Sequence, residues 1–164
     1  MSRFRWPQRP TRTPQQDTLD GDHNTVTKPR VLIADDHAIV AQGLNLLLKD
    51  SCDLVGTVGD GPSLVKAALE LKPDVIVADI SMPGFDGLEA VRRLRREGLT
   101  ARIVMLTMYA DPDLAQAALA AGANAYVLKH SAGEELLQAI RLVCRGESYV
   151  TPYVFRERRR QGPF

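Results

Sequence analysis

The stretch RVLIADDHAIVAQGLNLLLK, residues 30–49, decides the fold of this chain. Residues 31–34 are an uninterrupted apolar run, the pattern of a short strand buried on both faces of a parallel sheet. Residues 37–49 repeat apolar side chains with a helical period, so they predict an amphipathic helix. A buried strand followed directly by a helix is the first unit of an alternating β/α chain.

The same alternation recurs to the end of the apolar sequence and predicts five strands in all. The further strand candidates are short apolar runs of the kind buried on both faces of a sheet, and they lie at residues 54–58, 75–78, 103–106 and 125–128. Between them lie helix signals of three kinds: prolines suited to a first turn, capping-box pairs, and glycines suited to a helix end. These are, in that order, Pro62 and Pro112, Asp86 with Glu89 and Ser131 with Glu134, and Gly122 and Gly146.

Two of the predicted helices have informative faces. In the last helix one apolar stripe is predicted to pack on the sheet, formed by Leu136, Leu137, Ile140, Val143 and Cys144. The helix after the third strand carries four arginines, interpreted as a solvated face, at positions 92, 93, 95 and 96. Because right-handed crossovers place helices on both sides of a parallel sheet, the fold class is α/β, doubly wound.

Length and composition indicate one globular domain. The chain has 164 residues and is 45% apolar, enough for one hydrophobic core. No apolar stretch approaches the roughly 18 residues of a membrane helix, and the N-terminus lacks the apolar part of a secretory signal, so a cytoplasmic protein without membrane contact is expected. Cys52 and Cys144 lie far apart in no CxxC pattern, which favours neither a disulfide framework nor a zinc site.

The charge distribution divides the chain into three parts. Residues 1–29 carry five basic and three acidic groups, residues 151–164 carry four and one, and the middle keeps 12 basic and 16 acidic groups. With four prolines and little apolar periodicity, residues 1–29 predict a flexible arm. Residues 30–146 are predicted as the folded domain, and residues 147–164 as a basic tail or linker remnant. For the basic residues at this end, a solvated chain end is favoured over a nucleic-acid contact.

Polar residues follow four of the five predicted strands. Asp35 and Asp36 end the first strand, Asp79 the third, Thr107 the fourth and Lys129 the fifth. Carboxyl ends of parallel strands meet at one edge, where three carboxylates would repel one another unless a cation neutralises them. Mg²⁺ suits oxygen ligands of this kind. One carboxylate then remains to attack phosphorus, with Lys129 as a positive charge and Thr107 as a hydroxyl donor.

These residues, with the loop DISMPGFDG at residues 79–87, resemble the signature of response-regulator receiver domains over about residues 30–146. The sequences of residues 34–37, 106–109 and 122–129 are similar to the NarL/LuxR-type subgroup of transcriptional regulators. The resemblance implies a flavodoxin-like (βα)5 sandwich with a five-stranded parallel sheet of order 2-1-3-4-5.

The resemblance also implies a role for each site residue. Asp79 is the phosphoacceptor, and Thr107 and Lys129 bind the phosphoryl group. The implied Mg²⁺ ligands are Asp36, Asp79 and the backbone carbonyl of Ser81, with Asp35 acting through water. Tyr126 is implied as the switch aromatic whose rotamer follows Thr107, although a role as a half-buried sheet aromatic is an open alternative. His37, at a helix start, is assigned no chemistry.

The implied function is two-component signal transduction, with a histidine kinase or phosphotransfer protein as donor and a homodimer as a possible output. The receiver is not a turnover enzyme beyond limited self-phosphorylation and self-dephosphorylation. About 14 residues follow Val150, too few for a helix-turn-helix, so direct sequence-specific DNA binding is not expected. Two alternatives stay open: a truncated transcriptional regulator without its DNA-binding domain, and an aspartyl-phosphate phosphatase, disfavoured because Ser81 stands where such enzymes carry a second carboxylate.

Overall fold

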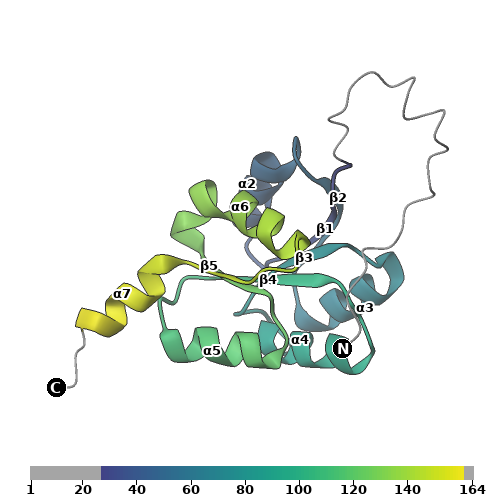
Figure 1. Cartoon of the computed structure of the whole chain (residues 1–164). Helices are drawn as coiled ribbons and strands as arrows, with labels where there is room; N and C mark the ends of the chain where they lie inside the picture. The colour runs from purple at the N-terminus through teal and green to yellow at the C-terminus, as the bar shows by residue number, and fades with distance from the viewer. Residues whose placement is uncertain (1–26, 161–164) are drawn as a thin grey trace.

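The computed structural model describes residues 27–160, and the side chains of residues 27–156. The predicted arm therefore lies largely outside the described residues, as do residues 161–164 of the basic tail and the side chains of residues 157–160. Strands and helices alternate along the chain (Figure 1). The elements are β1 (Arg30–Ala34), α2 (Ala38–Leu48), β2 (Asp53–Val58), α3 (Gly61–Leu71), β3 (Val75–Asp79), α4 (Gly87–Arg96), β4 (Arg102–Thr107), α5 (Pro112–Ala121), β5 (Ala125–Leu128), the 3₁₀ turn η1 (Lys129–Ser131), α6 (Ala132–Cys144), β6 (Tyr149–Val150) and α7 (Pro152–Arg160).

The strands form one parallel sheet in the order β2-β1-β3-β4-β5-β6. The predicted α/β fold and the order 2-1-3-4-5 are confirmed, and the structure adds a sixth strand of two residues beside β5. One detail of the prediction was wrong. The run at residues 54–58 is not buried on both faces, because β2 forms an edge of the sheet and none of its residues is fully buried.

Alternating side chains of the strands build two cores, one on each face of the sheet. Val31 and Ile33 of β1 face the core shared with α2 and α6, whereas Leu32 and Ala34 face the core shared with α3, α4, α5 and α7. Figure 1 shows α2 and α6 on one side of the sheet and α3, α4 and α5 on the other. The period of two along each strand thus decides which helices it touches.

Most predicted helix ends are confirmed by backbone and capping geometry. The Asp86 side chain accepts a hydrogen bond from the Glu89 amide at 2.9 Å, and Gly122 ends α5 with a φ of 118°. The capping box predicted at Ser131 is not formed, since Ser131 makes no side-chain cap hydrogen bond. The reason is the 3₁₀ turn η1, which leads directly into α6 and gives Ser131 a helical backbone.

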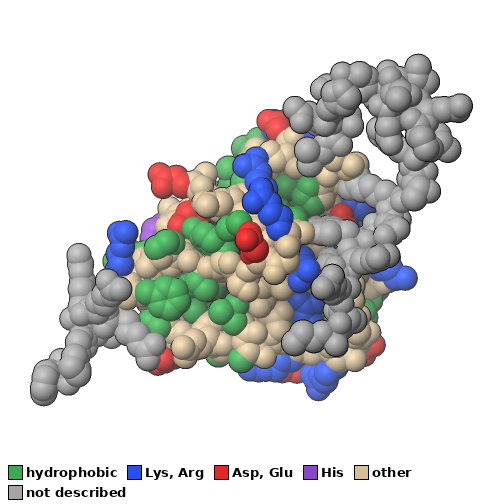
Figure 2. Space-filling view, viewed as in Figure 1, with side chains coloured by type: hydrophobic (Ala, Val, Ile, Leu, Met, Phe, Trp, Pro, Cys, Tyr) green, Lys and Arg blue, Asp and Glu red, His purple; other side chains and the backbone are tan. Residues whose placement is uncertain are grey.

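The folded structure continues beyond residue 146, where the sequence analysis placed the end of the domain. Strand β6 pairs with β5, and Val154 of α7 is fully buried in the core beside α5. Tyr153 and Phe155 of α7 are 40% and 47% exposed. Figure 2 shows apolar side chains gathered above α5, on the side where α7 lies. None of the helices in the described part of the chain is long and apolar enough to cross a membrane.

Arg95 departs from the solvated face predicted for the arginines of α4. Its guanidinium donates to the carbonyls of Leu99 and Ala101, both at 2.8 Å, and to the carbonyl of Gly122 at 2.8 and 3.1 Å. It also donates to Asn124 Oδ1 at 3.0 Å. Burial lowers the pKa of Arg95, with a smaller contribution from Arg102. Arg95 therefore ties α4 to the loops that precede β4 and β5.

Replacing Arg95 by methionine is expected to lower the free energy of unfolding by about 3 kcal/mol, because several backbone carbonyls lose their charged donor. Urea denaturation measures the loss. Arg92→Met is the matched control, since Arg92 lies on the same helix with a side chain 50% exposed, and it should change stability by less than about 0.5 kcal/mol. Equal stability of the two variants would contradict the role given to Arg95.

Candidate functional site

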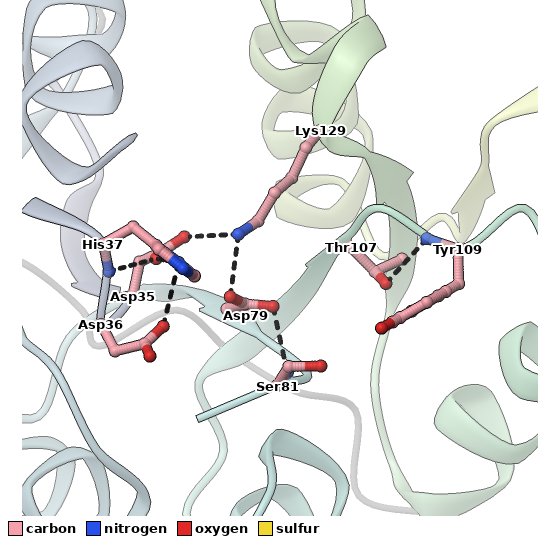
Figure 3. Close-up of polar contacts among 8 residues, drawn as sticks. All are labelled: Asp35, Asp36, His37, Asp79, Ser81, Thr107, Tyr109 and Lys129. Carbon is pink, nitrogen blue, oxygen red and sulfur yellow. Dashed lines mark hydrogen bonds and ion pairs between the residues drawn. The ribbon is translucent and has the colours of Figure 1, made fainter. Parts of the chain in front are cut away.

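The predicted site residues lie at the carboxyl ends of β1, β3, β4 and β5. Strand β1 pairs with β3 so that Ala34 lies beside Ala78, which puts the next residues of the two strands, Asp35 and Asp79, side by side. Lys129 follows β5 directly. Figure 3 shows the carboxylates and the Lys129 amine pointing toward one another from separate elements.

Lys129 bridges the two buried carboxylates. Its Nζ lies 2.8 Å from Asp79 Oδ2 and 2.9 Å from Asp35 Oδ2. Asp35 and Asp79 are each only 4% exposed. Burial by itself would lower the pKa of Lys129, but the hydrogen bonds and charges of Asp79 and Asp35 outweigh it, so the pKa lies above its ordinary value. The site therefore holds a permanent cation between two carboxylates that have little water around them.

Asp36 and His37 complete the acidic end of the site. Asp35, Asp36, His37 and Asp79 offer ligand atoms that all lie within 4.8 Å of one another. His37 Nδ1 is 3.1 Å from Asp36 Oδ1 and 3.2 Å from Asp35 Oδ1, and the His37 amide donates to Asp35 Oδ1 at 2.8 Å. His37 was predicted to have no chemical role, yet its ring lies at the site. The available signal was its position two residues after Asp35, where a backbone amide readily bonds an Asp side chain.

The loop after β3 folds back closely onto the strand. The Ser81 amide donates to Asp79 Oδ1 at 3.0 Å, and the Gly87 amide donates to the Ile80 carbonyl at 2.7 Å. A Cβ atom at Gly87 would lie 2.5 Å from the Asp79 carbonyl oxygen, a clash with backbone that cannot move aside. Glycine at this position therefore allows the loop to close over β3, and both oxygens of Asp79 are held, Oδ1 by Ser81 and Oδ2 by Lys129.

Thr107 and Tyr126 meet at one residue of the loop after β4, not at the carboxylates. Thr107 Oγ1 accepts from the Tyr109 amide at 3.1 Å, and the Tyr126 hydroxyl donates to the Tyr109 carbonyl at 2.5 Å. Tyr126 lies in β5 with no exposed surface, so the sheet aromatic of the sequence-based alternative is fully buried and not half-buried. Burial raises its pKa to about 12. Met108, which lies between Thr107 and Tyr109 in the sequence, is 74% exposed.

The donor set fits a hard divalent cation. Carboxylate oxygens of Asp35, Asp36 and Asp79 converge at one edge of the sheet, and the Asp36 side chain is 30% exposed, so one flank of the cluster is open to water. Mg²⁺ prefers oxygen ligands and usually keeps several waters, both of which this arrangement provides. In the part of the chain that the structure describes, these three carboxylates face the one ammonium of Lys129, so they carry excess negative charge that a divalent ion would balance.

Comparisons with known proteins agree with this geometry. The model of the response regulator receiver domain family matches residues 31–141. The response regulator GacA of Pseudomonas viridiflava is 39% identical over 127 residues, which are 76% of this chain and 59% of GacA. The transcriptional regulatory protein LiaR of Bacillus subtilis is 41% identical over 120 residues, 72% of this chain and 57% of LiaR. The chain thus spans less than two thirds of the length of these curated relatives.

A solved structure gives the same picture in three dimensions. The two-component response regulator of the LuxR family from Aurantimonas sp. SI85-9A1 superposes with a TM-score of 0.77 at 32% identity, covering 82% of this chain and 98% of that one. The predicted similarity to the NarL/LuxR-type subgroup is confirmed by these matches. The chain belongs to the response regulator receiver domain family and contains the receiver domain of a two-component regulator.

Proposed function

We propose that Asp79 is the phosphoacceptor of this receiver domain. The observation that carries the proposal is the buried Asp79 carboxylate with Lys129 Nζ 2.8 Å from its Oδ2. An Asp79 oxygen attacks phosphorus and forms an acyl phosphate, while the bond from phosphorus to the donor breaks and the leaving group keeps the electron pair. Lys129 neutralises charge on the transferring group, and the Ser81 amide holds the other Asp79 oxygen in place.

Asp36, Asp79 and the backbone carbonyl of Ser81 are the proposed Mg²⁺ ligands, with Asp35 acting through water. Bound Mg²⁺ would neutralise negative charge on the phosphoryl oxygens as the group transfers. The proposal is supported by the convergent carboxylates of Asp35, Asp36 and Asp79, whose oxygens lie within 4.8 Å. Lys129 keeps Asp35 beside this cluster through the 2.9 Å ion pair.

Thr107 and Tyr126 are the proposed switch residues, and Tyr109 connects them. In the unmodified protein the Tyr109 amide donates to the Thr107 hydroxyl oxygen and the Tyr109 carbonyl accepts from Tyr126. A phosphoryl group on Asp79 offers charged oxygens to the Thr107 hydroxyl on the neighbouring strand. A movement of Thr107 toward them would break its bond with the Tyr109 amide, and the loop after β4 would then reposition the Tyr126 hydroxyl.

The proposed donor is a histidine kinase or phosphotransfer protein of the cytoplasm, and the proposed output is a change in protein contacts, including formation of a homodimer. Turnover is limited to self-phosphorylation from small donors and self-dephosphorylation. We further propose that residues 30–146 form the receiver unit, with β6 and α7 packed on them. We also propose that this unit serves a transcriptional regulator, because the relatives GacA and LiaR are longer regulators of which this chain matches 59% and 57%.

The test is intact-mass measurement of the full chain after incubation with acetyl phosphate. With Mg²⁺ present, the mass should rise by that of one phosphoryl group. With the divalent ion chelated, labelling is expected to slow by about a hundredfold, because the converging carboxylates then repel the anionic donor. Absence of any adduct in saturating donor and Mg²⁺ would refute the proposed phosphoacceptor function, and equal rates with and without chelator would refute the metal site.

A further inference from the structure

The C-terminal segment, residues 149–156, is bonded to the strand that leads into the site. Strand β6 pairs with β5, and the Thr151 amide donates to the Tyr126 carbonyl at 2.9 Å. After Thr151 the chain turns into α7, and the Val154 amide of this helix donates a hydrogen bond to the Thr151 carbonyl at 3.1 Å. Backbone pairing with β5 ends here, and the Thr151 carbonyl is bonded to the first turn of α7.

The Thr151 side chain continues the pairing instead. Its Oγ1 accepts from the Leu128 amide at 3.1 Å, and Leu128 and Thr151 are 0% and 2% exposed. A buried amide without an acceptor is costly, so this hydroxyl fixes the last residue of β5. Leu128 is the residue immediately before Lys129.

Glu135 of α6 orients the Thr151 hydroxyl. Thr151 Oγ1 lies 3.1 Å from Glu135 Oε2, so the hydroxyl proton is donated to the carboxylate and the oxygen lone pairs face the Leu128 amide. The Tyr149 hydroxyl donates to Glu135 Oε1 at 2.6 Å. Both oxygens of Glu135 thus accept hydrogen bonds from the C-terminal segment. Because the Thr151 hydroxyl donates to Glu135 and accepts from the Leu128 amide, its orientation is fixed.

Lys129 lies between two residues that contact this segment. Leu128 before it is bonded by Thr151, and the His130 ring after it meets the Tyr153 ring edge-on, with centroids 6.0 Å apart. Lys129 itself starts the 3₁₀ turn η1. The direction in which its side chain leaves the sheet therefore depends on contacts made by residues 151 and 153, more than twenty residues further along the chain.

We propose that Thr151 is a positioning residue for phosphoryl transfer, which holds Lys129 in reach of Asp79 through the Leu128 amide and is itself oriented by Glu135. The inference rests on the proposed function of Asp79 and Lys129. Its consequence is that the C-terminal segment, residues 149–156, takes part in the chemistry of the site through the last residue of β5, which it holds.

Two substitutions at Thr151 separate hydrogen bonding from packing. Thr151→Val keeps the shape and loses the hydroxyl, whereas Thr151→Ser keeps the hydroxyl and loses the methyl group. The initial rate of acetyl phosphate labelling is measured by intact mass on the folded full chain. Thr151→Val should label about fivefold more slowly or worse, the cost of one misplaced hydrogen-bonded group, and Thr151→Ser should stay within about twofold of wild type.

Val154→Ala is the control for loss of α7 packing, because Val154 is fully buried yet makes no side-chain bond to the site. It should lower thermal stability and leave the labelling rate of the folded protein unchanged. Should Thr151→Val not fold, Glu135→Ala takes its place, since it removes the acceptor of the Thr151 proton, and it should also slow labelling.

Each outcome decides a different question. No adduct on wild type overturns the proposed function and this inference together. Labelling of wild type with an equal rate for Thr151→Val, or for Glu135→Ala in its place, overturns the inference alone. A slower rate for Thr151→Ser than for Thr151→Val assigns the residue to packing and also overturns it. Slow labelling of Thr151→Val with recovery in Thr151→Ser supports the positioning role.

Discussion

Asp79→Asn is expected to carry no phosphoryl group after incubation with acetyl phosphate and Mg²⁺, whereas the wild-type chain gains one. The amide of asparagine keeps the shape of the side chain but is not a nucleophile toward phosphorus. Intact mass gives the stoichiometry, and fragmentation of the labelled wild-type protein locates the group. Because the change removes one of three neighbouring carboxylates, the folded protein should be at least as stable as wild type without divalent ions.

Asp86→Asn is the matched control for this substitution. Asp86 lies on the loop that follows Asp79, but its side chain caps α4 by accepting a hydrogen bond from the Glu89 amide at 2.9 Å. Since asparagine is also a good N-cap residue, stability should change by less than about 1 kcal/mol, and labelling should proceed as in wild type. An Asp79→Asn variant labelled as fully as wild type would exclude Asp79 as the acceptor.

Lys129→Met is expected to lower both the free energy of unfolding and the rate of labelling. Without divalent ions, the buried carboxylates of Asp35 and Asp79 lose the cation that lies 2.9 and 2.8 Å from them. The free energy of unfolding should fall by about 2 kcal/mol, less than for a fully enclosed pair because the site has an open flank. The labelling rate should fall by about a hundredfold, the usual cost of removing one group that stabilises transferring charge.

Magnesium should restore more stability to Lys129→Met than to wild type. The ion and the ammonium neutralise the same carboxylates, so without the lysine the ion binds more strongly and stabilises the folded state further by mass action. Urea denaturation with and without Mg²⁺ measures both effects. Lys66→Met, at an exposed position of α3, should change neither quantity. Equal responses of Lys129→Met and wild type to Mg²⁺ would contradict a shared site.

Much of the architecture follows from local sequence patterns. Uninterrupted apolar runs such as residues 31–34 and 75–78 define buried strands, and the helical periods between them define the crossovers. Once those strands are parallel, polar residues that follow them meet at one edge. The neighbourhood of Asp35, Asp79 and Lys129 was therefore predictable from three separate stretches of sequence.

Other features depended on partners that no local pattern reveals. Arg95 has the sequence context of its exposed neighbours on α4, but the Gly122 carbonyl that it binds lies 27 residues away. Strand β6 has only two residues and no strand signal of its own, so its pairing arises from the open edge of β5. His37 reaches the site because its amide bonds the Asp35 side chain.

The sequence by itself determined the α/β class, the alternation of strands and helices along the chain, and the edge of the sheet at which the acidic residues gather. These follow from hydrophobic periodicity, which is a property of neighbouring residues. Only the tertiary structure decided that Tyr126 is buried, that Arg95 joins α4 to two loops, and that Thr151 bonds the residue before Lys129. A buried polar group takes whichever partner the packed elements bring within reach, and that depends on contacts between distant parts of the chain.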